Sequence, residues 1–115
     1  MNGKISNYLL YLGFIPNKIG YKYLVDIISM GVKGGDILPL SKNGYVTLSA
    51  KYKKSASTIE KDIQNAVSAA WLKGDVDILN EEFGSTIDMK KGKPSNKHFI
   101  LTAIEKIGYL NGVKY

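Results

Sequence analysis

The chain has 115 residues, of which 44% are hydrophobic, so a single domain spanning residues 1–115 can bury a core of its own. It contains no cysteine, which excludes disulfide bonds and thiolate metal sites and fits a reduced compartment, the cytoplasm. Its sixteen basic residues are all lysines and outnumber the ten acidic residues, and the resulting formal net charge of +6 suits a polyanionic partner.

The apolar residues recur at helical spacing along most of the chain. A first stripe covers residues 5–12 and stops at Gly13. A second stripe comprises Tyr21, Leu24, Val25 and Ile28 and is closed by Gly31 and the turn GVKGGD. A third, short helix is predicted from apolar residues spaced three and four apart: Tyr45, Leu48 and Tyr52.

Three more helices are predicted in the second half of the chain. The fourth spans about residues 57–73, the fifth about residues 76–83, and the sixth begins after Pro94. The apolar stripe of the sixth consists of Phe99, Ile100, Ala103, Ile104 and Ile107. Only short pieces such as residues 85–89 suit an extended conformation. The sequence therefore predicts an all-α, six-helix domain.

The fourth predicted helix has two chemically different sides. At about 100° per residue, its apolar side consists of Ile59, Ile63, Ala66, Val67 and Ala70, with Trp71 at the margin. Its polar side consists of Ser57, Thr58, Lys61, Gln64, Asn65 and Ser68. Ser57 and Glu60 have the spacing of a capping box, which predicts that the helix begins at Ser57 and that both side chains cap it.

The third and fourth helices are separated by only a few residues, which is typical of a helix-turn-helix, here at about residues 42–73. Side-chain amides can bond bidentately to adenine in the major groove, and lysine can donate to guanine. Five residues of the polar side are therefore candidates for reading DNA bases: Ser57, Thr58, Lys61, Gln64 and Asn65. The alternative is that this side is only the solvated surface of a helical hairpin.

A resemblance to a known family is carried by the same residues. The matching segments run from about residue 15 to residue 107 and include IPNKIGYKYL, IISM, SASTIE, AAW, GDVDILNEEFG and KPSNKHFI. The chain resembles the C-terminal effector domain of stage zero sporulation protein A, the response regulator of sporulation in endospore-forming Firmicutes. The resemblance implies a six-helix domain whose third and fourth helices bind double-stranded DNA, with neighbouring copies as a tandem dimer on short boxes.

The fourth helix also departs from the family's pattern. The family usually has arginine at the positions that match Thr58, Lys61 and Gln64, and histidine at the position of Asn65. Lysine lacks the planar fork with which arginine reads guanine, so the family's DNA box cannot be transferred directly. We expect Gln64 and Asn65 to shift the preference toward adenine. Glu60 agrees with the family and is either a base contact by analogy or a helix cap by its spacing, of which we favour the cap.

Lysines cluster in two other segments. These lysines are candidates for DNA phosphate contacts: Lys51, Lys53, Lys54, Lys90, Lys91 and Lys93. About five such contacts predict that the logarithm of the affinity falls with the logarithm of the salt concentration, with a slope of about −0.9 per contact. The alternative is an ordinary solvated surface.

Residues 74–84 carry four acids and no lysine, so they are poor candidates for DNA contact. In the family, the matching region faces the transcription machinery. The resemblance therefore implies a surface for the sigma subunit of RNA polymerase, formed by Asp75, Asp77, Glu81 and Glu82. The alternative is that these are solvated charges of a helix.

The remaining motifs indicate no cofactor, no metal and no catalytic site. DVDILNEE lacks the glycine and the ligand spacing of a calcium loop. The single histidine, His98, has no thiol partner for zinc, and the sequence nominates no serine with a base and an orienting acid. The apolar run YLLYLGFI is too short to cross a bilayer, so we expect no membrane partner.

The leading interpretation is a sequence-specific, double-stranded-DNA-binding transcription regulator and not an enzyme. The rival is a protein-interaction module that binds RNA polymerase or a full-length regulator without reading DNA. Nothing in the chain shows the alternation of strands and helices expected of the family's receiver domain. We therefore interpret the chain as an effector domain, either excised or a stand-alone paralogue that phosphorylation does not gate.

Overall fold

The structure is a computed structural model that describes residues 2–84, 87 and 90–110. Within this part, six helices follow one another: α1 (Asn2–Leu12), α2 (Ile19–Val32), α3 (Gly44–Tyr52), α4 (Ala56–Lys73), α5 (Val76–Phe83) and α6 (Asn96–Leu110). No β-strand occurs among these residues. The predicted all-α class and the order of the helices are confirmed. The piece expected to suit an extended conformation, residues 85–89, lies outside the described residues except for Ile87.

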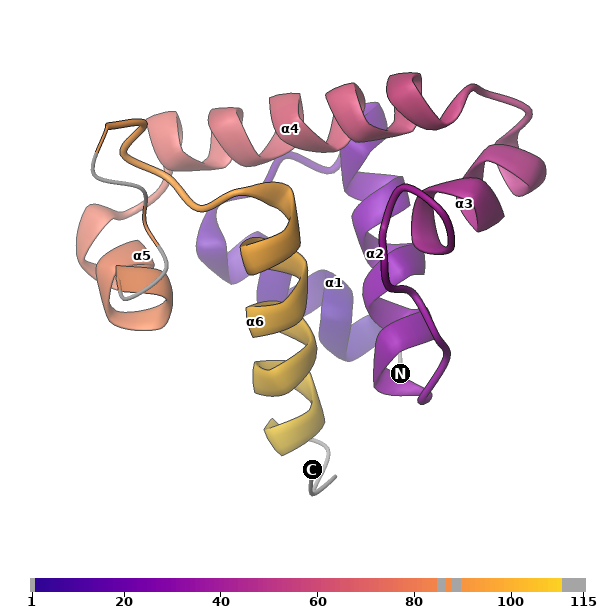
Figure 1. The fold of residues 1–115 in the computed structure, drawn as a ribbon. Coiled ribbons are helices and arrows are strands. Elements are labelled where there is room, and N and C mark those ends of the chain that lie inside the picture. Colours follow the sequence, from indigo (N-terminus) through magenta and orange to yellow (C-terminus); the bar gives the residue numbers. More distant parts are fainter. Residues whose placement is uncertain (1, 85–86, 88–89, 111–115) are drawn as a thin grey trace.

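The helices pack around α2, which contacts α1, α3, α4 and α6. In Figure 1, α4 lies across the top of the molecule, α6 descends from beneath it, and α3 and α5 lie near its two ends. One long side of α4 therefore rests on the core, and the opposite side forms the outer surface of the domain.

The buried side of α4 is the predicted one: Ile59, Ile63, Ala66, Val67 and Ala70. Burying these apolar side chains removes their surface from water, which is the main force that holds an amphipathic helix onto a domain. At the margin, the ring of Trp71 is edge-on to Phe83 at 5.5 Å and to Phe99 at 5.9 Å between centroids. Trp71 thereby links α4 to α5 and α6.

The buried side of α2 differs in part from the predicted stripe. Leu24 and Ile28 are fully buried, as expected, whereas Tyr21 and Val25 are only half-buried. Tyr23 is buried in their place. The difference arises because α1, α3, α4 and α6 all pack on α2, so its buried surface is broader than a single stripe.

Two glycines of α2 allow its close contacts with other helices. The helix ends at Val32, within the predicted turn GVKGGD, so Gly31 is its penultimate residue and not the residue that stops it. A Cβ atom at Gly31 would overlap the side chain of Ile104 in α6, and one at Gly20 would overlap the carbonyl oxygen of Asp62 in α4. Close packing against backbone therefore requires glycine at position 20, whereas a larger residue at position 31 would displace the end of the Ile104 side chain.

The first residue of α4 also differs from the prediction. The N-cap is Ser55, whose hydroxyl oxygen accepts a hydrogen bond from the backbone N–H of Thr58 at 3.1 Å. Ser57 already lies inside the helix, so the predicted capping box of Ser57 and Glu60 was wrong. Both serines have suitable chemistry, but the path of the turn from α3 brings Ser55 to the capping position.

The last two helices begin as the sequence predicts. The carboxylate of Asp75 caps α5 by accepting the backbone N–H groups of Asp77 at 2.9 Å and Ile78 at 3.3 Å. The hydroxyl of Ser95 accepts the backbone N–H of His98 at 3.2 Å in the first turn of α6. His98 is thus an early, exposed residue of the last helix.

Candidate nucleic-acid interface

A turn of three residues, 53–55, joins α3 to α4. Lys53 adopts the left-handed conformation with φ of 56°, which reverses the chain direction within this short span. The hydroxyl of Ser49 in α3 donates to the carbonyl oxygen of Lys54 and fastens the turn to the preceding helix. Because α3 and α4 also pack on each other, they form a helix-turn-helix unit.

The helix-turn-helix is fixed to α2 through Asp26. This half-buried carboxylate accepts hydrogen bonds from the Lys51 ammonium at 2.8 Å and from the Tyr52 hydroxyl. Burial, followed by the hydrogen bond to Asp26, raises the pKa of Tyr52 above its ordinary value. The hydrogen bond that Lys51 itself donates to Asp26 raises the pKa of Lys51, so its positive charge is retained but is partly neutralised by Asp26.

The predicted base-reading residues lie together on the outer side of α4. All five are exposed: Ser57, Thr58, Lys61, Gln64 and Asn65. Thr58 is the one most involved in the fold, because its hydroxyl also accepts a hydrogen bond from Ser55 at 2.8 Å. Lys61, Gln64 and Asn65 are spaced three and four residues apart, so their side chains form one continuous stripe along the helix.

The predicted phosphate-contacting lysines form two groups beside α4. Lys53 and Lys54 are exposed just before its first turn. Lys90 and Lys91 are exposed in the segment before α6, and Lys93 is half-buried because its ammonium donates to the Ser68 hydroxyl of α4. The bond between Lys93 and Ser68, which are 25 residues apart, thus holds the segment of Lys90, Lys91 and Lys93 beside α4.

Asn96 has a positional role that the sequence did not reveal. Its side-chain amide donates to the carbonyl oxygen of Glu60 at 3.0 Å and to the Tyr45 hydroxyl at 3.2 Å. The start of α6 is thereby bonded to both helices of the helix-turn-helix. An asparagine at the start of a helix suggests local capping, and no pattern in the sequence points to a bond 36 residues away.

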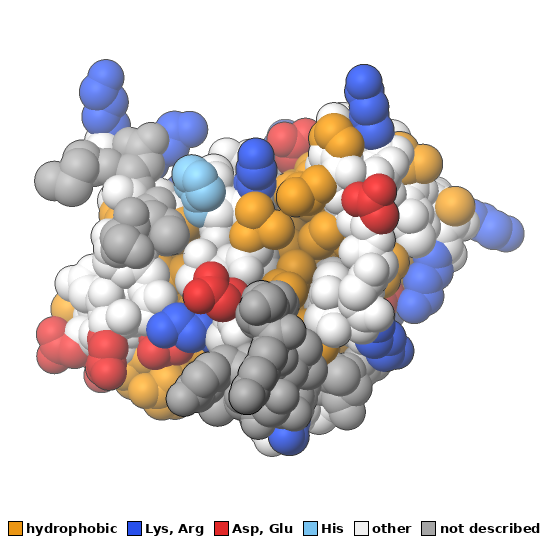
Figure 2. All heavy atoms as spheres, turned by 60° about the horizontal axis from the view of Figure 1, so that its bottom comes forward, with side chains coloured by type: hydrophobic (Ala, Val, Ile, Leu, Met, Phe, Trp, Pro, Cys, Tyr) orange, Lys and Arg blue, Asp and Glu red, His pale blue; other side chains and the backbone are white. Residues whose placement is uncertain are grey.

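The four acidic residues predicted to face polymerase do not share one environment. Asp75, Asp77 and Glu81 are exposed on or next to α5. Figure 2 shows acidic side chains gathered at its left edge, the side on which α5 lies. Glu82 is half-buried, accepts the Tyr8 hydroxyl at 2.7 Å and lies 3.9 Å from the Lys106 ammonium. Glu82 therefore connects α5 to α1 and α6.

The described part of the chain has neither a metal-binding cluster nor a membrane-spanning helix. It holds no group of three or more His, Cys, Asp or Glu residues that could bind a metal ion. None of its helices combines the length and apolar character needed to cross a membrane.

An amphipathic helix presented by a short turn, with exposed amides on its outer side and lysines beside it, defines a helix-turn-helix domain of the DNA-binding class. A family model described as "Sporulation initiation factor Spo0A C terminal" matches residues 5–107, from within α1 to within α6. The chain belongs to this family of DNA-binding effector domains of a sporulation response regulator.

Proposed function

We propose that the chain is a sequence-specific transcription regulator that binds double-stranded DNA with α4 in the major groove. The observation that carries this proposal is the stripe of Lys61, Gln64 and Asn65, which is exposed along α4 while the opposite side of the helix is buried. The major groove is about 12 Å wide and admits an α-helix. A rigidly held helix can therefore present these side chains to base edges.

The stripe contains donors and acceptors that distinguish base pairs. Gln64 and Asn65 can each accept from adenine N6 and donate to N7, whereas Lys61 can donate to guanine O6 and N7. The short side chains of Ser57 and Thr58 let the first turn of α4 approach the DNA closely. Because arginine is absent from the whole chain, we propose that the preferred site is richer in adenine contacts than that of the family.

Lysines beside α4 then hold the helix in register through the DNA phosphates. Lys53 and Lys54 act before the first turn, and Lys90, Lys91 and Lys93 act in the segment before α6. Lys51 contributes less, because its ammonium lies 2.8 Å from the Asp26 carboxylate. Neighbouring copies bind tandem DNA sites, and the site of action is the cytoplasm, where bacterial DNA lies.

The exposed acids of α5 form a second surface, away from the stripe. We assign Asp75, Asp77 and Glu81 to contact with the sigma subunit of RNA polymerase. Leu72, with 82% of its surface exposed, and Val76, with 63%, lie next to these acids in the sequence and add apolar contact area. Glu82 is left out because it is bonded to Tyr8.

The same exposed residues favour a second candidate function, a protein-interaction module. In this alternative, the domain binds polymerase or a full-length regulator through Leu72, Val76 and the acids and does not read DNA. The change of the family's arginines to Thr58, Lys61 and Gln64 is consistent with a reading helix that has lost its function. The two candidates differ in whether the stripe on α4 affects binding of duplex DNA.

A duplex-binding experiment separates them. DNA sites are selected from a random pool, and the affinity for a selected duplex and for its scrambled version is then measured at two salt concentrations. The double variant Lys61→Ala with Asn65→Ala should lose at least about 2 kcal/mol of specific binding, because single base contacts contribute about 1–3 kcal/mol each. The matched control, Lys73→Ala with Asn80→Ala, removes the same two residue types from exposed positions outside the stripe.

The outcomes distinguish the functions clearly. Equal affinity for both duplexes at low salt, together with capture of purified polymerase by the domain, would support the protein-interaction module. Equal loss of binding in the stripe variant and in the matched control would contradict readout by α4. If the selected sites equal the unaltered family box, the shift toward adenine is wrong, although DNA binding itself stands.

A further inference from the structure

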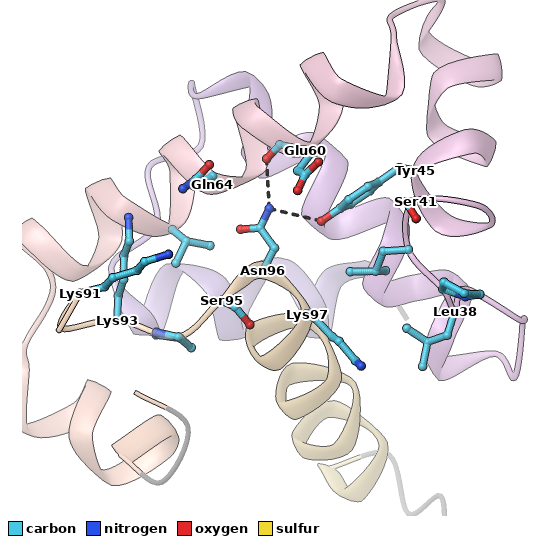
Figure 3. Close-up of a pocket in the computed structure, with 14 residues that line it drawn as sticks. Leu38, Ser41, Tyr45, Glu60, Gln64, Lys91, Lys93, Ser95, Asn96 and Lys97 are labelled. Atoms are coloured by element: carbon cyan, nitrogen blue, oxygen red, sulfur yellow. Dashed lines mark hydrogen bonds between the residues drawn. The ribbon is translucent and has the colours of Figure 1, made fainter. Parts of the chain in front are cut away.

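A pocket of about 600 Å³ lies beside the helix-turn-helix, lined by residues from 38–45, which lead into α3, from 60–67 of α4, and from 91–97, which lead into α6. Its volume is within the range of about 300–1,000 Å³ that is usual for small-molecule sites. Figure 3 shows it from the side, with Glu60 and Gln64 of α4 above and Asn96 in the centre. The pocket is separate from the polymerase-facing acids.

Positive charge dominates the lining. It contains the lysines Lys91, Lys93 and Lys97 and one carboxylate, Glu60, which leaves a formal excess of two positive charges. In Figure 3, the side chains of Lys91 and Lys93 rise toward Gln64, and Lys97 lies on the other side of Asn96. A phosphomonoester carries about −1.5 to −2 charges at neutral pH, so its charge matches this excess. A phosphodiester group of DNA carries only one negative charge and therefore matches this excess less well.

The rest of the lining is largely apolar and suits the apolar faces of an organic ring. The apolar residues are Leu38, Pro39, Leu40, Val67 and Pro94. The Tyr45 hydroxyl accepts a hydrogen bond from Asn96 and so keeps its own proton for donation to a ligand. The Asn96 amide donates to Tyr45 and Glu60, which leaves its carbonyl oxygen as an acceptor. One donor and one acceptor thus stand next to the apolar surface.

We propose that this pocket binds a nucleoside 5′-monophosphate. The phosphate lies between Lys91 and Lys93, and the base lies against the apolar residues, within reach of Tyr45 and Asn96. Lys93 already donates one proton to Ser68, and the other two donors of its ammonium serve the phosphate. No covalent step is involved.

Occupation of the pocket opposes DNA binding, a consequence that rests on the proposed function. Gln64 lines the pocket and also belongs to the exposed stripe of α4. A nucleotide that bonds to Gln64 removes it from the adenine edge, and its phosphate occupies Lys91 and Lys93. Ligand and DNA therefore compete for three side chains.

The test measures nucleotide binding to the full chain without DNA, so its result does not depend on the proposed function. Isothermal titration is performed with adenosine, guanosine, cytidine and uridine 5′-monophosphates, with the four nucleosides, and with inorganic phosphate. At least one nucleotide should bind, roughly tenfold or more tightly than its nucleoside and than phosphate alone, since both parts contribute contacts. Failure of all four nucleotides, or equal binding of nucleoside or phosphate alone, would overturn the proposal.

Two variants of Ser41 test the location. This exposed residue lines the pocket from the segment before α3, outside the DNA stripe. Ser41→Glu places a negative charge in the pocket and should weaken nucleotide binding by roughly tenfold or more. Ser41→Gln introduces a side chain of the same size as glutamate but without its charge, so this variant should bind the nucleotide as tightly as the wild type does. Equal affinity in Ser41→Glu, with helical content unchanged in circular dichroism, would place the nucleotide elsewhere and overturn the assignment.

The last measurement uses duplex DNA, because the phosphate groups of its backbone could bind the same lysines as the nucleotide. Saturating nucleotide should weaken the affinity for the selected duplex, whereas an unchanged affinity would overturn the competition. If no nucleotide binds and Ser41→Glu weakens duplex binding, the lysines of the pocket serve the DNA backbone, and the nucleotide site is refuted.

Discussion

Ser55 and Ser57 are two residues apart at the start of α4, and only one of them caps the helix. The Ser55 hydroxyl accepts the Thr58 N–H at 3.1 Å, whereas the Ser57 hydroxyl lies 3.2 Å from that of Ser55 and is exposed. The capping-box spacing favoured Ser57, because the sequence does not show where the turn at Lys53 ends. Individual residues can thus be assigned the right chemistry and the wrong position.

Replacing the N-cap residue Ser55 should destabilise the domain without removing a side chain that is proposed to contact DNA bases. Ser55→Ala should lower the free energy of unfolding by about 1 kcal/mol, because it leaves a backbone N–H of the first turn without its acceptor. Urea unfolding followed by circular dichroism measures this change. Ser57→Ala is the control and should stay within about 0.5 kcal/mol of the wild type. A larger loss for Ser57→Ala than for Ser55→Ala would contradict the observed cap.

Tyr8 shows how burial changes the acidity of a single group. Its ring is buried, and its hydroxyl donates to the Glu82 carboxylate at 2.7 Å. Burial, and then the bond to Glu82, raise the pKa of Tyr8 above its ordinary value of about 10. Loss of this proton in the folded state would place two negative charges side by side.

The raised pKa of Tyr8 predicts alkaline destabilisation. A group whose pKa is higher in the folded state stabilises the fold fully below its unfolded pKa, and this contribution is lost as the pH rises above about 10. Above that value, the wild type should lose about 1 kcal/mol of unfolding free energy per pH unit more than Tyr8→Phe. Urea unfolding of both proteins at about pH 9 and about pH 11 measures the difference. Parallel losses would show that Tyr8 is not responsible.

At the scale of helices, the position of α4 depends on how closely α2 can approach it. Gly20 faces the backbone carbonyl of Asp62, and a Cβ atom there would overlap it. A carbonyl in the middle of a helix cannot move without the helix, so a larger side chain must displace α4 relative to α2. The outer stripe would be displaced with it.

Gly20→Ala should therefore lower both stability and DNA affinity. Overpacking of this kind costs about 1–3 kcal/mol of unfolding free energy. Gly84→Ala is the control, because nothing lies within 4 Å of a Cβ there and its φ of −51° suits alanine. It should remain within about 0.5 kcal/mol of the wild type. Thermal unfolding and duplex titration of both variants test this, and a Gly20→Ala protein as stable as Gly84→Ala would refute the close approach.

At the scale of the whole molecule, charge is separated between surfaces. The lysines before α4 and before α6 lie next to the stripe, whereas the exposed acids gather at α5. Association driven by phosphate contacts releases counterions from DNA, so its strength depends on salt. The net charge of +6 predicts this attraction, but the number of contacts depends on which lysines are already paired.

The salt dependence of DNA affinity should distinguish two lysines close to the turn between α3 and α4. Lys54 is exposed, whereas the Lys51 ammonium lies 2.8 Å from Asp26. Lys54→Gln should reduce the slope of log affinity against log salt by about 1, and Lys51→Gln should reduce it less. Duplex titrations at four or more salt concentrations yield these slopes. Equal reductions, or a wild-type affinity independent of salt, would contradict the arrangement.

Helix order, the buried side of α4 and its polar outer side could be read from the amino acids in advance, because helical periodicity and side-chain polarity are local properties. The amino acids do not reveal in advance three long-range bonds: Asn96 to Glu60, Lys51 to Asp26 and Tyr8 to Glu82. These bonds join residues 36, 25 and 74 positions apart, and such pairs are brought together only when the helices pack. The pocket beside α4 arises for the same reason, since three separate segments must meet to line it.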